Sequence, residues 1–258
     1  MTARTARELA APADLRAAAD DDPLLLWAAR GLTRGARAWH LGDAAAVASP
    51  ALSGRDRIAV RGPLDDALPL LRQVLDATGP AFRPLGERAL VTALARRLPD
   101  LAHAGDFGLM TTTGPALPPA PPGLPAAHWL APAELPEAAA LLDRHFATSY
   151  AHPQRPGADA WAGVRDPHGR LTAIAADAWS SPEVGLLAGV ATDPARGRGN
   201  GHAEAACRLV LDRHLTRRGR AALLVDDANT AAIRLYTRLG LRLHPLAAAH
   251  RTAPDGRV

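Results

Sequence analysis

The sequence contains no lysine, a single cysteine and no long uninterrupted apolar run. Without a second cysteine, the chain can form neither an intramolecular disulfide nor a multi-cysteine zinc site, and we predict no metal. With no apolar stretch of about 18 residues it has no candidate membrane span, and its N-terminus lacks the apolar core of a signal peptide. We therefore expect a soluble cytoplasmic protein without a membrane partner.

All 30 basic residues are arginines, and with 26 acidic residues they give a formal charge of +4. They are interspersed with aspartates and glutamates instead of forming a basic stripe with aromatic residues between them, so a nucleic-acid partner is not expected. The absence of lysine also excludes a Walker loop, which requires Gly-Lys-Ser/Thr.

A dense run of prolines, PALPPAPPGLP at residues 115–125, divides the chain. Such a run sustains neither a helix nor a central strand and forms a semi-rigid extended connector. We therefore predict an N-terminal α+β domain at residues 1–114, a linker at 115–125 and a C-terminal domain at 126–258.

In the first part, the hydrophobic pattern predicts a helical stretch over residues 6–19, a strand at 58–60, helices at 64–78 and 87–100, and a closing strand at 106–113. This part contains no motif that carries chemistry. The second part is more regular and predicts the order strand, helix, three strands, helix, strand, helix, strand. That order is typical of a mixed sheet covered by helices.

The central motif of the second part is ATDPARGRGNGHAEAA, residues 191–206. An apolar strand ends at Thr192, a glycine-rich loop follows, and a helix is predicted to begin near Gly201. Backbone N–H groups and the positive end of a helix dipole then point at one place, which suits a phosphate or pyrophosphate. The spacing G-x-G-x-G differs from the dinucleotide fingerprint, so a nucleotide-binding protein is a poorer interpretation.

The segment Arg196-x-x-Gly199-x-Gly201 resembles the R/Q-x-x-G-x-G/A signature of the GNAT superfamily of N-acetyltransferases. A second segment, LLVDDANTAAIRLYTRLGLRL at residues 223–243, resembles the family's closing strand and helix. The resemblance covers the chain from about Ala126 onward. It implies an α/β fold with a mixed sheet that is splayed open where acetyl-CoA enters.

The resemblance also implies a set of cofactor-binding residues. Backbone groups of the strand end would meet the pantetheine arm, the loop would surround the pyrophosphate, and Asn229 would lie beside the pantetheine. The residues carried over are Val190, Ala191, Thr192, Arg196, Gly197, Arg198, Gly199, Asn200, Gly201, His202 and Asn229. Two alternatives stay open: Asn229 as a helix cap only, and His202 as a solvated residue at a helix start.

In the family, a tyrosine at the position of Tyr236 is commonly the general acid that protonates the departing thiolate, although a packed core tyrosine is the alternative. Direct transfer also needs a group that accepts the proton of the amine. Glu183 is the nearest candidate and Asp177 another, although an exposed residue at a strand end is the favoured interpretation of each. Cys207 lies on an apolar helical stripe, so no acyl-cysteine intermediate is expected.

Two positions depart from the family pattern. One residue separates Pro194 from Arg196 where the family commonly has two, so we expect a reshaped loop there. Leu241 stands where phenylalanine is frequent.

The resemblance implies an acyl-CoA-dependent N-acyltransferase that passes acetyl from acetyl-CoA to a primary amine by direct attack in a ternary complex. The alternative is a non-catalytic acyl-CoA-binding or sensing module. We hypothesise that the N-terminal half is a degenerate second GNAT-like copy that shapes the acceptor cleft or a homodimer surface, because it has no R-x-x-G-x-G loop. The acceptor, a small-molecule or protein amine, is left open.

Overall fold

The computed structural model describes residues 4–197 and 199–252. The N-terminal part contains β1 (Arg7–Leu9), α1 (Pro12–Ala19), α2 (Pro23–Ala29), β2 (Arg37–Leu41), β3 (Ala44–Leu52), β4 (Arg55–Arg61), α3 (Leu64–Thr78), β5 (Arg83–Glu87), α4 (Arg88–Arg97) and β6 (Leu101–Thr113). The C-terminal part contains β7 (Ala127–Trp129), α5 (Leu135–His145), β8 (Ala158–Arg165), β9 (Leu171–Ala178), β10 (Gly185–Thr192), α6 (His202–Arg218), β11 (Arg220–Val225), α7 (Thr230–Arg238) and β12 (Arg242–Arg251).

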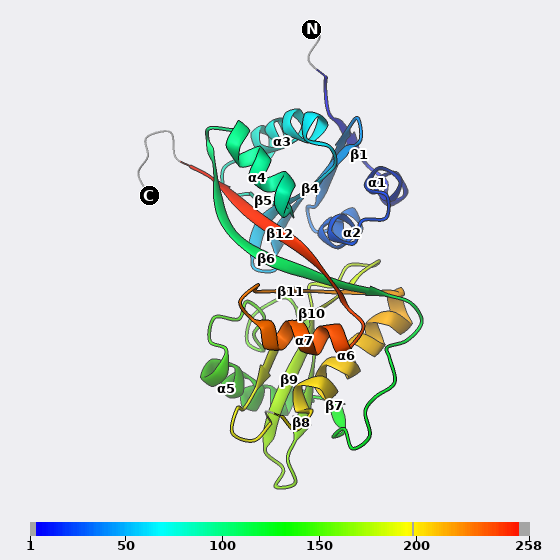
Figure 1. The fold of residues 1–258 in the computed structure, drawn as a ribbon, viewed down its shortest axis with the longest axis vertical. Helices are drawn as coiled ribbons and strands as arrows, with labels where there is room; N and C mark the ends of the chain where they lie inside the picture. The colour runs from blue at the N-terminus through cyan, green and yellow to red at the C-terminus, as the bar shows by residue number, and fades with distance from the viewer. Residues whose placement is uncertain (1–3, 198, 253–258) are drawn as a thin grey trace.

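The strands form one continuous sheet in the order β1-β2-β3-β4-β5-β12-β6-β11-β10-β9-β8-β7. The last strand of each part lies beside the fifth strand of the other: β12 pairs antiparallel with β5, and β6 pairs antiparallel with β11. At the centre, β6 and β12 pair with each other from Arg242↔Thr111 to Arg251↔Leu101. Figure 1 shows these two strands running from the upper, N-terminal group of elements into the lower one.

The two parts repeat one order of elements. Each runs strand, helix, three strands, helix, strand, helix, strand, with a second helix, α2, after the first in the N-terminal part. In both parts the fourth and fifth strands are parallel neighbours, β4 with β5 and β10 with β11. The predicted mixed sheet and the predicted element order of the second part are confirmed. The domain boundaries stay a prediction, since residues 115–125 hold no helix or strand but the sheet joins both parts.

The first part differs from its prediction in two ways. Residues 7–9 form β1 instead of the start of a helix, and strands β2, β3 and β5 were not expected. β3, AAAVASPAL, is rich in alanine, a residue that favours helix in isolation. It is a strand because β2 and β4 pair with it on both sides.

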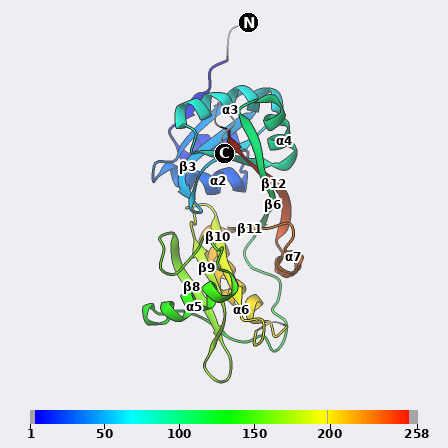
Figure 2. The same ribbon diagram turned by 90° about the vertical axis from the view of Figure 1, so that its left-hand side faces the viewer.

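Three apolar clusters hold the helices on the sheet. In the N-terminal part, α3 and α4 pack on one face of the sheet. In the C-terminal part, α6 packs on the sheet in the same way. The third cluster joins α1, α2 and α5 across both parts. Within it, the indole Nε1 of the buried Trp27 donates to the carbonyl oxygen of Trp179 at 2.9 Å. Figure 2 shows the two groups of elements joined by the β6–β12 pair.

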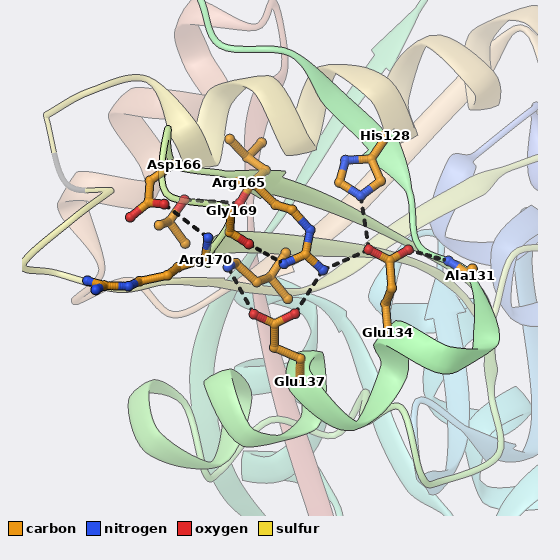
Figure 3. A network of polar contacts seen from close by, with 11 residues as sticks. His128, Ala131, Glu134, Glu137, Arg165, Asp166, Gly169 and Arg170 are labelled. Carbon is orange, nitrogen blue, oxygen red and sulfur yellow. Dashed lines mark hydrogen bonds and ion pairs between the residues drawn. The ribbon is translucent and has the colours of Figure 1, made fainter.

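A polar network ties β7 and the start of α5 to the hairpin of β8 and β9 (Figure 3). The guanidinium of Arg165 contacts Glu134 at 2.7 Å and Glu137 at 2.8 Å. Glu134 also accepts from the backbone N–H of Ala131 and lies 3.3 Å from His128. The Arg165 hydrogen bond, followed by those of Ala131 and His128, lowers the pKa of Glu134 to about 2.

None of the helices in the described ranges combines the length and the hydrophobicity that crossing a bilayer requires.

Because β12 belongs to both parts, we predict that Leu246→Ala destabilises the whole chain. Leu246 is 4% exposed and packs in the cluster that spans both parts, so its truncation should cost about 2–5 kcal/mol. Leu243→Ala on the same strand, where the side chain is 41% exposed, is the control and should cost less. Calorimetry should give one unfolding transition that shifts as a unit. Two transitions, of which only one moves, would contradict the shared strand.

We also predict that Arg165→Gln raises the pKa of Glu134 from about 2 toward its ordinary 4.5. Because the folded pKa is lowered, the network stabilises the fold above about pH 4.5 and loses that contribution as the pH falls toward 2. A carboxyl NMR titration measures the shift. Arg170→Gln on the same hairpin is the control and should leave the pKa of Glu134 unchanged. An unshifted pKa in Arg165→Gln would show that the network does not hold the carboxylate.

Candidate functional site

The parallel strands β10 and β11 separate part of the way along. They pair only from Gly185↔Ala221 to Leu187↔Leu223, and the rest of β10, from Ala188 to Thr192, has no partner on that side. A cleft of about 990 Å³ lies where the strands diverge. Its walls come from the ends of β10 and β11, the start of α6 and one side of α7.

A bulge in β10 turns its backbone toward this cleft. The register with β9 shifts between Ala188 and Ala191, and Gly189 has a φ of +58°. A Cβ at Gly189 would lie 2.7 Å from the ring of Trp161, so only glycine fits. The predicted cofactor residues Val190, Ala191 and Thr192 all line the cleft. An unpaired strand edge can accept the polar groups of an extended ligand.

The glycine loop brings the start of α6 to the mouth of the cleft. Gly199 (φ +80°) and Gly201 (φ +74°) adopt left-handed conformations, and Gly201 caps α6 without a side-chain hydrogen bond. The N–H groups of Gly199, Ala203 and Glu204 find no backbone acceptor among the described residues. Donors of this kind at a helix start, together with the helix dipole, suit an anion. Gly197 and Asn200 lie in the same loop; the predicted Arg198 lies outside the described residues.

Asp193 contacts the residues that lead into the glycine loop. Its carboxylate accepts from the N–H of Ala195 at 2.9 Å and from Arg196 Nη1 at 2.5 Å. The Arg196 hydrogen bond lowers the pKa of Asp193. Arg196, predicted to contact the pyrophosphate, is thus engaged with a neighbouring carboxylate. Ala195 is the single residue of the shortened spacer before Arg196, and Asp193 holds it in place.

His202, the first residue of α6, is buried against Thr172. Thr172 Oγ1 donates to the carbonyl of Val164 at 3.0 Å and therefore accepts from His202 Nδ1, 2.5 Å away. In the neutral ring this leaves Nε2 as an acceptor only. A contact from Nε2 to a phosphate therefore requires the doubly protonated ring, although His202 does line the cleft.

Tyr236 and Asn229 come from α7 and its cap. Tyr236 is 6% exposed and lines the cleft. Its hydroxyl oxygen is not among the side-chain atoms that are fully buried and lack a hydrogen-bond partner. Burial, with a smaller effect from Cys207, raises its pKa well above the ordinary value, so the phenol stays protonated. Asn229 caps α7 through its side chain, which accepts from Ala232 N at 3.1 Å, and it also lines the cleft.

Cys207 is fully buried inside α6, and burial followed by the nearby Glu204 raises the pKa of its thiol. A neutral thiol in the core is a poor nucleophile. This agrees with its interpretation as a packing residue.

The structure does not bring the two candidate bases into the cleft. Glu183 precedes β10 at the end away from the cleft and lies 3.8 Å from Arg16 of α1. Asp177 is 1% exposed and contacts Arg213 of α6 at 2.6 Å. Although burial opposes its ionisation, His214, Ser180 and Arg213 hold the pKa of Asp177 below its ordinary value. Glu183 as a general base remains a prediction without support from this geometry.

A second cavity, of about 420 Å³, adjoins the cleft. The two share lining residues at the point where β10 and β11 diverge: Phe146, Leu187, Ala188, Gly189, Leu224, Val225 and Asp226. The N-terminal part supplies another section of the wall from β4, β5 and β6, and the segment after α5 supplies a further section with Ser149, Tyr150 and Ala151. An acceptor molecule there would meet a cofactor in the cleft.

Several cavity residues were not predicted as part of the site. Asp226 directly follows β11 and lines both cavities. His145 lines the cleft with its Nε2 buried and without a partner among the described residues. The arginines of β4 and β5 gave no local signal, because their proximity depends on strand pairing. Only the position of Asp226 at a strand end next to the motif could have pointed to it.

The corresponding place in the N-terminal part is closed. β4 and β5 pair from Arg57↔Arg83 to Val60↔Gly86, which leaves only Arg61 of β4 beyond the last pair. The turn from β4 into α3 consists of Gly62 and Pro63, and a Cβ at Gly62 would lie 2.5 Å from Ala44 Cα. No long loop and no opened strand pair are therefore present between residues 55 and 87.

Comparison with known proteins gives a family for the C-terminal part. Residues 133–241 match the model of the acetyltransferase (GNAT) family. No curated protein matches the chain in a sequence search.

Solved structures resemble the whole chain in fold. A GCN5-related N-acetyltransferase from Sphaerobacter thermophilus has a TM-score of 0.57 at 17% identity, covering 99% of this chain and 98% of that one. One from Kribbella flavida has a TM-score of 0.56 at 19% identity, covering 83% and 88%. A tandem GNAT protein from the clavulanic acid biosynthesis pathway has a TM-score of 0.52 at 13% identity, covering 97% and 99%. This last similarity fits the repeated order of elements. Residues 133–241 thus match the acetyltransferase (GNAT) family, and the whole chain resembles GNAT proteins in fold.

Proposed function

We propose that the chain is an acyl-CoA-dependent N-acyltransferase that passes acetyl from acetyl-CoA to a primary amine by direct attack in a ternary complex. The observation that carries this proposal is the junction of two cavities where β10 and β11 diverge. One cavity has an anion site at its mouth and the other has room for an acceptor. Tyr236 lies in the wall of the first.

In the proposed complex, the pyrophosphate of acetyl-CoA lies at the start of α6, where the N–H groups of Gly199, Ala203 and Glu204 have no backbone acceptor in the part of the chain that the structure describes. The carboxylate of Glu204 does not oppose this, because it lies 3.1 Å from Arg208 and 3.6 Å from Arg238. The pantetheine arm runs along the unpaired edge from Val190 to Thr192. Its amide groups would take the place of the missing strand partner.

The transfer requires two proton movements. The neutral amine nitrogen attacks the thioester carbonyl carbon, a C–N bond forms, and the C–S bond breaks. Tyr236 donates its phenolic proton to the departing sulfur, which its raised pKa permits because the phenol is protonated at neutral pH. The nitrogen loses a proton to solvent or to a carboxylate at the junction, where Asp226 lines both cavities.

We predict that one acetyl-CoA binds per chain and that Ala203→Asp weakens this binding. A carboxylate in the first turn favours the helix but repels a pyrophosphate, so the variant should remain folded. Isothermal titration should give one site in the wild type and an affinity weakened at least about tenfold in the variant. Ala203→Ser is the uncharged control. Two sites per chain, or full binding by Ala203→Asp, would contradict the assignment.

We predict that Tyr236→Phe lowers kcat by about 100-fold or more and changes the affinity for acetyl-CoA little, because only proton donation is lost. Thiol release with a panel of amines measures kcat. Thr237→Ala, which removes an exposed hydroxyl from the same helix, is the control and should keep full turnover. Undiminished turnover in Tyr236→Phe would remove the tyrosine from the mechanism. Binding of acetyl-CoA without thiol release from any amine would instead favour the non-catalytic binding module.

A further inference from the structure

Three arginines of the N-terminal part line one wall of the second cavity: Arg55, Arg57 and Arg83. Arg57 and Arg83 are register partners in the parallel pair of β4 and β5, so their side chains leave the sheet on the same face. Arg55 lies two residues before Arg57 on the same strand and faces the same way. Strand pairing thus brings three positive charges together.

No carboxylate neutralises this cluster within the described residues, where Arg55, Arg57 and Arg83 form no ion pair with any acidic side chain. Arg57 is only 7% exposed, and its Nε donates to the carbonyl of Leu52 at 3.0 Å. Burial, together with the charges of Arg55 and Arg83, lowers the pKa of Arg57 to about 10. Buried positive charge without a partner is costly, and a bound anion would relieve that cost.

The neighbours of the cluster help to define its shape. The Nε of Arg55 donates to the hydroxyl of Tyr150 at 2.8 Å, and its guanidinium lies 5.2 Å from the centre of the Tyr150 ring. This contact holds Arg55 in place but uses a neutral partner. The guanidinium groups therefore keep donors for a further acceptor, and planar guanidinium groups suit carboxylates and phosphates.

The acidic residues of the same cavity come from other elements. Asp226 lies at the junction with the cofactor cleft, and Asp106 of β6 lies 3.6 Å from Arg88 and 3.3 Å from His103. The wall thus has a positive region on β4 and β5 and a carboxylate at the junction. A molecule with an amine at the junction and an anionic group on the arginines matches this distribution of charge.

We infer that the acceptor is an amine that also carries a carboxylate or phosphate group, which Arg55, Arg57 and Arg83 bind in the second cavity. The inference rests on the proposed transferase function, which supplies the reactive thioester at the junction. It assigns the N-terminal part the recognition of the acceptor.

The first test compares matched pairs of amines by thiol release from acetyl-CoA: amino acids against their carboxamides, and phosphoethanolamine against ethanolamine. The wild type should prefer one anionic class over its neutral partner by about tenfold or more in kcat/KM. Arg83→Gln and Arg55→Gln, both at partly exposed side chains, should lose that preference through a fall in kcat/KM for the anionic amines. Arg72→Gln, on the exposed side of α3, is the control. Equal use of neutral amines by the wild type would overturn the inference and leave the transferase function standing.

The second test does not depend on turnover. With CoA saturating the cofactor cleft, inorganic phosphate is titrated into the wild type and the variants. Binding should weaken by about tenfold or more in Arg83→Gln and Arg55→Gln and be unchanged in Arg72→Gln. Phosphate binding that is absent, or that survives both substitutions, would overturn the inference. Binding as expected, without thiol release from any amine, would support the anion site and contradict the transferase function.

Discussion

The pairing of β6 with β12 is the constraint on which the remaining structure depends. Each strand ends one part of the chain and lies beside the fifth strand of the other part. Neither part can complete its own sheet, because its last strand serves as the partner of the other. Because of this exchange, β4 and β5 lie on one side of the β6–β12 pair, and β10 and β11 lie on the other side. The second cavity lies between them, so its shape depends on both parts.

The two parts share one order of elements but differ in how far their fourth and fifth strands stay paired. In the N-terminal part, β4 and β5 stay paired almost to the end of β4, and a two-residue turn leads directly into α3. In the C-terminal part, the strands diverge after Leu187, and a glycine-rich loop precedes α6. Unpaired backbone groups in a strand are costly unless another partner satisfies them. An extended ligand along Val190–Thr192 would provide that partner, which gives a physical reason for the opened pair.

The C-terminal part was predictable because its signals are local. β9 is an apolar run bounded by turn residues, and α6 begins and ends at glycines in left-handed conformations, Gly201 and Gly219. The loop motif pointed to the proposed anion site for the same reason. In the N-terminal part, alanine-rich β3 carries little local preference for a strand, and pairing decides its structure. The strand exchange leaves no trace in a hydrophobic pattern.

The candidate site also contains some residues that the sequence could place and others that it could not. Val190–Thr192, the loop and Tyr236 could be placed from motifs, because chain order positions them relative to one another. The arginines of the second cavity could not, because residues 55, 57 and 83 become neighbours of Asp226 only through the folded sheet. Glu183 is an example of the opposite error, in which closeness in sequence does not mean closeness in the structure. It is close to the cleft in sequence, but β10 carries it to the far end of the strand, beside Arg16.

We propose that the C-terminal part holds the cofactor where β10 and β11 diverge, whereas the N-terminal part is closed at the corresponding place. Hydrogen–deuterium exchange of the full chain, with and without acetyl-CoA, tests it most directly. We predict that acetyl-CoA protects the backbone amides from Val190 to Thr192 and in the first turn of α6, and does not protect those from Arg61 to Asp66. Equal protection in both segments, or none at the start of α6, would contradict it.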